Sequence, residues 1–420
     1  MHNSTLNQLR TRWLDVYLIF VGLVSIVYGF HTAGQQHGWV IGEWLINYSD
    51  GFVRRGLLGE IILIASHIIK IRMAWLVFAV QVAAYVTFLW TVHRIARTSR
   101  WNIGLTFQVL SPATLSFIVL DPPTVFKKDN LLFAALGLLL CVFLFGRERL
   151  KVWQLSALLT ILLPALVLSH EPLLLYMPYL LAPVLLFSST WQRTLGIALF
   201  PAILTLCAAA AVATHPGTPE MARAICSSVG GAMPIKGEAV ESNICSGGIQ
   251  WLSRSAHEAQ QITAEAVQHD HYIPLYGLLV FPALVPGIWQ LVWLYRRRGM
   301  HRQVVIVAIC GALALAASTL LFVDALDWGR WIHMHAVCLM LLTLTLTSSF
   351  EPTPCPMKAP LALPGQGPLA AVRRPQKPLA VIVLAAWTLC WTLPAVPIYP
   401  SRTGYIGLVR YFLAYGSLHR

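Results

Sequence analysis

The sequence predicts an all-α polytopic membrane protein, with about eleven transmembrane helices and one amphipathic helix lying in the membrane interface. Of the 420 residues, 57% are hydrophobic and only 11% are charged, and the mean hydropathy is +0.66. A soluble domain carries roughly 25% charged residues. Apolar runs of about 17–25 residues recur along the chain, each long enough as a helix to cross a hydrocarbon core of about 30 Å. This excludes a soluble enzyme, and also a β-barrel, whose strands alternate polar and apolar residues.

The first span, residues 13–30, follows Arg10 and Arg12 and precedes no small-residue cleavage site. We therefore expect a retained anchor with the N-terminus in the cytoplasm. The further spans follow at 74–92, 102–120, 131–146, 153–168, 172–187, 195–213, 273–294, 303–323, 331–349 and 379–398. Residues 1–420 are expected to form a single integral membrane domain.

The segment from Leu57 to Ile71 decides the sidedness of every later loop. Its polar residues lie on one helical face and its Leu and Ile residues on the other, which favours an amphipathic helix in the interface, within a first outer loop of residues 31–73. If this segment does not cross the membrane, the basic segments at 93–100, 146–151 and 295–302 all lie in the cytoplasm, as the positive-inside bias requires.

With this register, all of the 17 Asp and Glu residues except Asp15, Glu148 and Glu351 lie at or beyond the outer face. Carboxylates contribute little to topology, so membrane insertion does not require this bias. We therefore expect an active site on the extracytoplasmic face of a bacterial inner-membrane protein. The net charge of +13 arises from Lys and Arg in loops that set topology and contact anionic lipid headgroups, so nucleic acid is not an expected partner.

Cys226 and Cys245 are the only two of the eight cysteines in the large outer loop, residues 214–272. In an oxidising compartment these two thiols could form a disulfide.

Residues 351–378 are rich in proline and lack periodicity. They are expected to form a cytoplasmic linker, to which we assign no function.

The outer-face segment 47–60 combines a carboxylate with two arginines. Asp50 and Gly51 form an Asp-Gly pair, which is typical of a turn, and Arg54 and Arg55 precede the interfacial helix. In one interpretation the arginines contact lipid headgroups. In the other they hold a ligand phosphate, with Asp50 as a general base or metal ligand.

A second outer-face segment, residues 121–130, begins with Asp121 and two prolines. Lys127 and Lys128 stand beside Asp129 at the start of the next span. Lysines on the outer side run against the positive-inside bias. They indicate either an error in the assigned topology or an anionic ligand drawn to this face.

Two further segments place ionisable groups at a membrane boundary. His170 and Glu171 either satisfy free backbone groups of a helical hairpin or act as an acid/base or hydroxyl-binding pair. Asp327 and Arg330 are spaced i, i+3, which predicts either a self-neutralising ion pair or, together with Trp328, a sugar-phosphate site. In such a site the indole packs on the sugar ring, the carboxylate binds hydroxyls and the guanidinium binds phosphate.

The architecture resembles that of polytopic glycosyltransferases of the GT-C type, which use lipid-linked sugars. The resemblance covers most of the chain but depends on single residues: Asp50 in a long first outer loop with an interfacial helix, Asp121 in the next outer loop, and Arg330 in a later one. It implies catalytic roles for the two carboxylates and a lipid-phosphate contact for Arg330. Asp50 stands outside any DxD or ExD pair, which leaves metal use open. The motifs DGFVRRGLLG and DWGRW also resemble uncharacterised bacterial membrane proteins of surface-polysaccharide synthesis, including O-antigen and exopolysaccharide polymerases.

We therefore expect a glycosyltransferase that moves a sugar from a polyprenyl-phosphate-type lipid carrier to a glycan or lipid acceptor. Asp50 would deprotonate the acceptor hydroxyl, and Asp121 would bind the acceptor or a divalent cation, the one candidate cofactor. The remaining candidates divide into two groups, with Arg54, Arg55, Lys127, Lys128 and Arg330 neutralising the departing phosphate, and His170, Glu171, Asp327 and Trp328 contacting the sugar or acceptor.

The nearest alternative is a polymerase or ligase of O-antigen or exopolysaccharide repeat units. A lipid-linked-sugar transporter or flippase ranks third, because transporters keep ionisable groups near the bilayer midplane. A purely structural membrane subunit also stays open. ATP-driven pumps, serine hydrolases and zinc proteases have no support, because the sequence contains no GxxxxGK[ST], GxSxG or HExxH motif.

Overall fold

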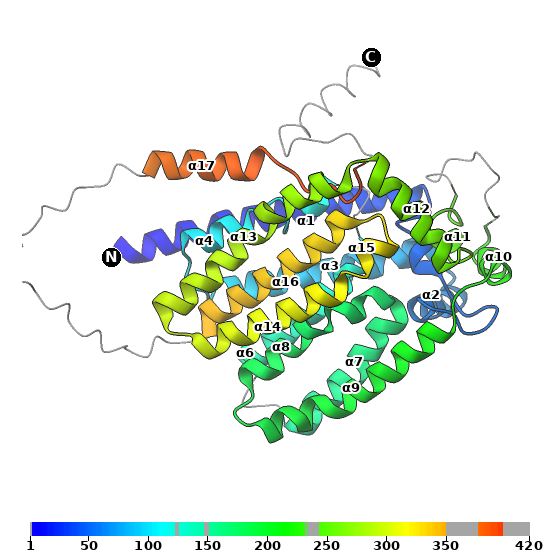
Figure 1. Ribbon diagram of the computed structural model, residues 1–420, viewed down its shortest axis with the longest axis horizontal. Helices are drawn as coiled ribbons and strands as arrows, with labels where there is room; N and C mark the ends of the chain where they lie inside the picture. The colour runs from blue at the N-terminus through cyan, green and yellow to red at the C-terminus, as the bar shows by residue number, and fades with distance from the viewer. Residues whose placement is uncertain are drawn as a thin grey trace, which may run out of the picture.

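Long helices that run roughly along one common axis form the body of the protein (Figure 1). The computed structural model describes residues 2–121, 126–146, 151–231, 233, 243–349 and 377–397. Within these ranges every regular element is a helix, and no strand is present. The longest are α1 (His2–Gly34), α3 (Met73–Ala96), α9 (Trp191–Thr214), α13 (Tyr272–Arg298) and α16 (Trp328–Ser349). The predicted all-α fold is confirmed.

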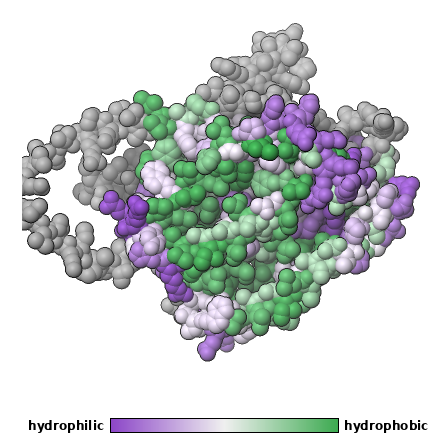
Figure 2. Space-filling view, viewed as in Figure 1, coloured by the Kyte–Doolittle hydropathy of each residue, from purple (hydrophilic) through white to green (hydrophobic). Residues whose placement is uncertain are grey.

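Seven stretches within the described ranges are long and apolar enough to cross a membrane. They comprise the five helices above, α7 (Val152–Ser169), and residues 301–324, which join α14 (His301–Ser318) and α15 (Leu321–Asp324). Shorter apolar helices occur at α6 (Asp129–Phe145) and where η3 (Glu171–Tyr176) continues into α8 (Met177–Phe187). On the face drawn in Figure 2, a broad hydrophobic band lies between hydrophilic ends. The chain is therefore an integral, polytopic membrane protein.

The segment 102–120, predicted as one span, is not a continuous helix. α4 (Ile103–Val109) ends after 7 residues, and α5 (Phe117–Leu120) forms a single turn. Between them Pro112 lacks an N–H and disfavours a helical conformation at the residue before it. Hydroxyl groups of Ser111, Thr114 and Ser116 bond to nearby backbone groups instead. Residues 111–121 are all buried, which is where a membrane protein tolerates non-helical backbone.

The last predicted span, 379–398, also forms a shorter helix than expected. α17 (Lys377–Leu389) has 13 residues, and the described chain beyond it leaves the helix. Tertiary hydrogen bonds hold the chain that follows the helix. The Asp121 carboxylate accepts the Ala395 N–H at 2.5 Å, and the Tyr276 hydroxyl donates to the Pro394 and Ala395 carbonyls at 2.9 Å. These contacts replace the helical hydrogen bonds that a longer span would make.

α1 and α3 are antiparallel neighbours, so the segment between them does not cross the bundle. Phe30 near the end of α1 packs on Trp75 at the start of α3, with ring centroids 5.0 Å apart. Trp13, near the other end of α1, packs on Trp101 beyond the end of α3, at 5.4 Å. As predicted, α2 (Gly56–Ile69) is not a span. It packs on η1 (Gly42–Leu45) with one face and exposes Ile61, Ile64 and Ile68 on the other.

In the described parts of the predicted large loop, residues 214–272, three helices lie at the same end of the molecule as α2 (Figure 1). They are α10 (Pro219–Ser228), α11 (Gly248–Trp251) and α12 (Ala256–His269). A disulfide joins Cys226 to Cys245, with the Cα atoms 5.5 Å apart. Gly248 approaches η1 so closely that an added Cβ would lie 2.6 Å from the Glu43 Cα. The loop therefore packs directly against η1.

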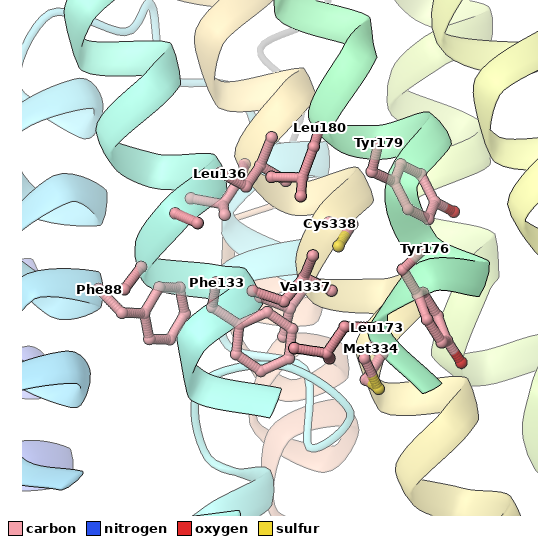
Figure 3. Close-up of a cluster of buried hydrophobic side chains, with 14 of the residues drawn as sticks. Phe88, Phe133, Leu136, Leu173, Tyr176, Tyr179, Leu180, Met334, Val337 and Cys338 are labelled. Carbon is pink, nitrogen blue, oxygen red and sulfur yellow. The ribbon is translucent and has the colours of Figure 1, made fainter. Parts of the chain in front are cut away.

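α16 is the central helix of the bundle. In its apolar stretch 94% of residues are buried, against 28–33% in the other six candidate spans. Figure 3 shows how side chains of α16, such as Met334 and Val337, pack among Phe88 of α3, Phe133 of α6 and Leu180 of α8. Because α16 starts with Trp328, it places Arg330 inside the protein at one end of the bundle.

Candidate functional site: a buried charge network

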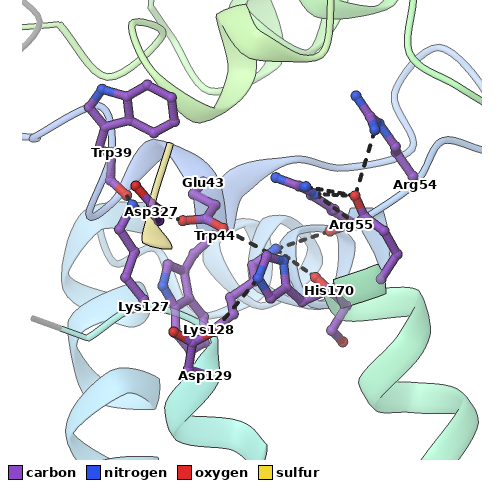
Figure 4. Close-up of polar contacts among 12 residues, drawn as sticks. Trp39, Glu43, Trp44, Arg54, Arg55, Lys127, Lys128, Asp129, His170 and Asp327 are labelled. Carbon is purple, nitrogen blue, oxygen red and sulfur yellow. Dashed lines mark hydrogen bonds and ion pairs between the residues drawn. The ribbon is translucent and has the colours of Figure 1, made fainter. Parts of the chain in front are cut away.

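Charged side chains from distant parts of the sequence meet at one end of the bundle (Figure 4). We call this group the charge network; it consists of Glu43, Arg54, Arg55, Lys127, Lys128, Asp129, His170, Glu171, Asp327 and Arg330. Its centre is buried, since Glu43, Lys128, His170 and Arg330 are each 4% exposed or less. A buried charge is costly unless it is paired, so the partner of each group determines what the network can do.

Arg330 lies in the first turn of α16 and binds both carboxylates near it. It donates to Asp129 through Nε and, at 2.9 Å, through Nη2, and it donates to Asp327 through Nη1 at 2.8 Å. Nη2 also donates to His170 Nε2 at 3.0 Å. Because a guanidinium can only donate, Nε2 accepts, and a neutral imidazole then carries its proton on Nδ1. That nitrogen lies 3.7 Å from Glu43 Oε1.

A short turn before α6 directs Lys127 into the network. Phe126 has a φ of 55°, in the left-handed region, and its carbonyl accepts a hydrogen bond from Trp44 Nε1 at 2.9 Å. Lys127 Nζ then donates to Glu43 Oε2 at 3.2 Å and to the Trp39 carbonyl at 3.0 Å. Lys127 thus neutralises a carboxylate of the first loop.

Arg55 and Glu171 form the second strong pair. Nε and Nη2 of Arg55 donate to the carboxylate at 2.6–2.8 Å, and Arg54 Nη1 lies 3.6 Å from Oε1. Arg55 has a φ of 68°, which is uncommon for a residue with a side chain. Its carbonyl accepts from Lys128 Nζ at 3.2 Å, and Lys128 also donates to the Ser169 carbonyl at 2.9 Å. Strained backbone held by its surroundings in this way clusters at functional sites.

Burial and neighbouring charge set the protonation states of the network. Burial would raise the pKa of Glu43, but the surrounding cations, Lys127 foremost, hold that pKa well below its usual range. Burial also opposes ionisation of Glu171, yet the charge and hydrogen bonds of Arg55 lower its pKa to about 2. Burial lowers the pKa of the Lys128 ammonium to about 7 and that of His170 well below its ordinary value. At neutral pH both carboxylates are therefore ionised and His170 is neutral.

One edge of the charge network is accessible. The side chains of Arg54, Arg55, Glu171 and Asp327 are 27%, 18%, 23% and 31% exposed. Deeper inside is a cavity of about 10 Å³, room for roughly one water molecule. Its polar lining comes from Lys127, Asp129, Asn130, Arg330 and His333. A larger ligand would therefore meet the network at its exposed edge.

Three predicted site residues lie outside the network. Asp50 is exposed in the turn before α2 and makes no hydrogen bond or ion pair with any residue that the structure describes. Asp121 is buried and binds the Ala395 N–H. Trp328 packs against the rings of Tyr272, Tyr276 and Phe322. All the other predicted phosphate-binding and sugar-binding residues belong to the network.

Sequence reasoning gave no role to Glu43 or Asp129, which the structure places at the centre of the network. Glu43 is the single charged residue in the apolar stretch from Trp39 to Ile46. A lone carboxylate among residues that favour burial has to find a cation. That isolation was the available signal, although the partner, Lys127, lies 84 residues away in the chain.

The carboxylates of the charge network are paired with cationic side chains. Glu43 binds Lys127, Glu171 binds Arg55, and Asp129 and Asp327 both bind Arg330. Over the described ranges, no three His, Cys, Asp or Glu side chains are grouped so that they could hold a metal ion. The arrangement is thus one of ion pairs with an accessible arginine edge, which suits an anion such as phosphate.

The chain matches a known family of membrane proteins over more than half of its length. A family model described as uncharacterised membrane protein Rv1490 matches residues 12–259. The matched region contains every residue of the charge network except Asp327 and Arg330. No curated protein and no solved structure matches the chain.

Proposed function

The chain belongs to the family of the uncharacterised membrane protein Rv1490, and we propose that it is a glycosyltransferase acting at the extracytoplasmic face of a bacterial inner membrane. It takes a sugar from a polyprenyl-phosphate-type carrier and adds it to a glycan or lipid acceptor. One observation supports this proposal: five cationic side chains converge with four carboxylates at one end of a membrane bundle. His170 is neutral, and Lys128, whose pKa is about 7, is only partly protonated at neutral pH, so the net charge of the network lies between zero and one positive charge.

The carrier phosphate meets the network at Arg54 and Arg55. Arg54 is the less engaged of the two, because its Nε is buried without a hydrogen-bond partner among the described residues and its Nη1 lies 3.6 Å from Glu171. A guanidinium binds two phosphate oxygens at once. Because negative charge grows on the departing phosphate in the transition state, cations fixed at this edge lower the barrier.

Asp50 is the proposed general base. It is exposed, lies four residues before Arg54 and has no partner in the described structure, so an acceptor hydroxyl can reach it. Glu43, by contrast, is 2% exposed and holds Lys127. In this proposal Glu43 is a positioning residue, which fixes the lysine and faces the Nδ1 of His170.

The place of the network in the bundle favours transfer over transport. Its members stand at helix ends and in the loops before them, for example Asp129 at the start of α6 and His170 directly after α7. Transporters keep their ionisable groups on broken helices near the bilayer midplane. A lipid-linked donor can approach such a site sideways from the membrane, with its phosphate at the level of the helix ends.

The test is complementation of cells that lack the gene. Such cells should accumulate a polyprenyl-phosphate-linked sugar, measured by mass spectrometry of lipid extracts, and the wild-type gene should remove it. Asp50→Asn should insert normally but leave the intermediate in place. Asp324→Asn is the matched control, since it alters an exposed carboxylate at the same end of the bundle.

Full complementation by Asp50→Asn would exclude Asp50 as the base. If the deleted strain accumulates no lipid-linked sugar, the transferase proposal itself is wrong. Chain-length analysis of the glycan product distinguishes the nearest alternative. A single added sugar fits a transferase, whereas a ladder of repeat units fits a polymerase.

A further inference from the structure

A second, larger cavity lies between α13, α14 and α16. Its volume is about 570 Å³, within the range of roughly 300–1,000 Å³ that is usual for ligand sites. Its wall is mostly apolar and includes Leu284 and Leu291 of α13, Val304 and Ala308 of α14, and Leu339 of α16. Along α13 the lining runs from Leu284 to Arg296, and along α14 from Val304 to Leu315. The cavity therefore extends from the middle of these helices toward the turn between them, at the end of the bundle opposite α10 to α12 (Figure 1).

The cavity opens sideways onto the apolar outer surface. Ile288 and Val292 of α13 and Val305 of α14 line it, and each is 43–50% exposed. In a membrane, this surface faces lipid hydrocarbon. The opening therefore connects the cavity with the space that acyl chains occupy.

The polar groups of the inner wall already have partners. His335 bonds to the Tyr179 hydroxyl through Nδ1 and to Ser318 Oγ through Nε2, both at 2.9 Å. Because both ring nitrogens are used, this wall offers packing contacts but little hydrogen bonding to a ligand. Such a wall suits a hydrocarbon chain better than a polar molecule.

The rim of the cavity carries positive charge. Arg296 lines it, and Arg297 and Arg298 follow in the last turn of α13. A cationic cluster at the end of a membrane helix attracts anionic lipid headgroups. An apolar cavity below and arginines at its rim together match a lipid with one chain inside and a negative headgroup outside.

We propose that this cavity binds one acyl chain of an anionic phospholipid, with the headgroup against Arg296–Arg298. The chain enters between α13 and α14 and ends near the His335–Tyr179 wall. The site is separate from the charge network, which lies at the other end of the bundle. The cavity shares no lining residue with the network, so the lipid-binding proposal does not depend on the reaction that the network performs.

The test uses the full-length protein in phosphatidylcholine vesicles that contain phosphatidylglycerol with a diazirine midway along one acyl chain. After illumination, mass spectrometry maps the labelled peptides, which should concentrate on the lining parts of α13 and α14. Gly311 lines the cavity, and a Cβ added to it would make only ordinary contacts, the nearest being the Tyr179 hydroxyl at 3.5 Å. Gly311→Leu should place a side chain in the space that the acyl chain would occupy and lower this labelling about tenfold, because crowding a site that the chain already fills opposes its binding.

Gly277→Leu is the matched control, since Gly277 lies in α13 with open space around its Cβ position and does not line the cavity. It should leave the labelling unchanged. Ala308→Leu is a second filling variant, in case Gly311→Leu does not fold. Arg296→Gln should lower labelling by phosphatidylglycerol about fivefold, the factor contributed by one arginine at an anionic surface. It should not change labelling by the matching phosphatidylcholine probe.

Three outcomes would overturn the proposal. Labelling spread evenly over the exposed helices, or unchanged in both filling variants, would identify bulk lipid only. Equal labelling by the two headgroups in the wild type would remove the anionic specificity. Cross-links between two copies of the chain at these positions would show that protein, not lipid, occupies the cavity.

Discussion

Glu171 gives direct access to the energetics of the charge network, because its pKa lies far from that of a free carboxyl group. Arg55 lowers this pKa from 4.5 to about 2 against the opposing effect of burial. A carboxyl group whose pKa is lower in the folded state stabilises the fold above its unfolded pKa and loses that effect as it is protonated. The free energy of unfolding should therefore fall as the pH is lowered from about 4.5 to about 2, as measured by denaturant unfolding in detergent.

Glu171→Gln should be less stable than the wild type at neutral pH and should show a flatter pH dependence in that interval. Glu265→Gln, which changes an exposed carboxylate on α12, is the control and should follow the wild-type curve. Parallel curves for the wild type and Glu171→Gln below pH 4.5 would show that Arg55 does not hold this carboxylate.

Single residues of the network differ in how far the sequence predicts their surroundings. Asp327 is three residues before Arg330, so helical spacing alone predicts their ion pair, and the structure has it at 2.8 Å. Asp129 is 201 residues away from Arg330, and no local pattern relates the two. The distribution of acidic residues along the sequence indicated which side chains share one end of the molecule. Which cation each carboxylate pairs with depends on tertiary packing, which sequence spacing does not encode.

The disulfide between Cys226 and Cys245 connects two structural elements, because it fixes the end of α10 to the segment that packs on η1. The two cysteines are 19 positions apart, and closing a loop of this size in the unfolded chain corresponds to about 3 kcal/mol of stability. The double variant Cys226→Ser/Cys245→Ser should lose roughly that amount in denaturant unfolding under non-reducing conditions. Reducing agent should destabilise the wild type but not the variant.

Cys207→Ser/Cys390→Ser is the matched control, since it also removes two sulfur atoms, here from exposed free cysteines. It should unfold like the wild type. An equal loss in both double variants would mean that the serine substitutions, rather than the lost cross-link, cause the effect.

Elements were predictable where apolar length alone decides them. The long helices such as α3 and α9 were found by their hydrophobic runs, whereas the segment 102–120, which is also mostly apolar, breaks. The break depends on Pro112 and three hydroxyl side chains, and on α16 covering them: the Ala113 carbonyl bonds to His333, and Phe117 stacks on the same ring. Hydropathy averages over a window and does not register such tertiary partners.

For the whole molecule, we predict that the end with the charge network faces the outside of the cell and the opposite end faces the cytoplasm. A protein that keeps only the disulfide-bonded cysteines receives one new thiol at a time. Asp50→Cys and Asp324→Cys stand at the end of the charge network, and Arg97→Cys and Arg297→Cys stand at the other end; all four positions are exposed. In intact cells, a membrane-impermeant maleimide should label the first two and should reach the last two only after permeabilisation.

Labelling of Asp50→Cys and Asp324→Cys from opposite sides would mean that α2 crosses the membrane, against the antiparallel packing of α1 and α3. Labelling of this pair only after permeabilisation would place the charge network in the cytoplasm. The extracytoplasmic reaction proposed here would then be wrong, while the fold would stand.

The hydrogen bond from Ala395 to Asp121 forms only late in the synthesis of the protein. The two residues are 274 positions apart, and a ribosome adds roughly 5–20 residues per second, so about 15–55 s pass between their synthesis. For most of that interval the irregular chain around Pro112 has neither α16 nor the C-terminal segment to cover it. We therefore expect the nascent protein to keep this segment beside the translocon or an insertase until its last helices arrive.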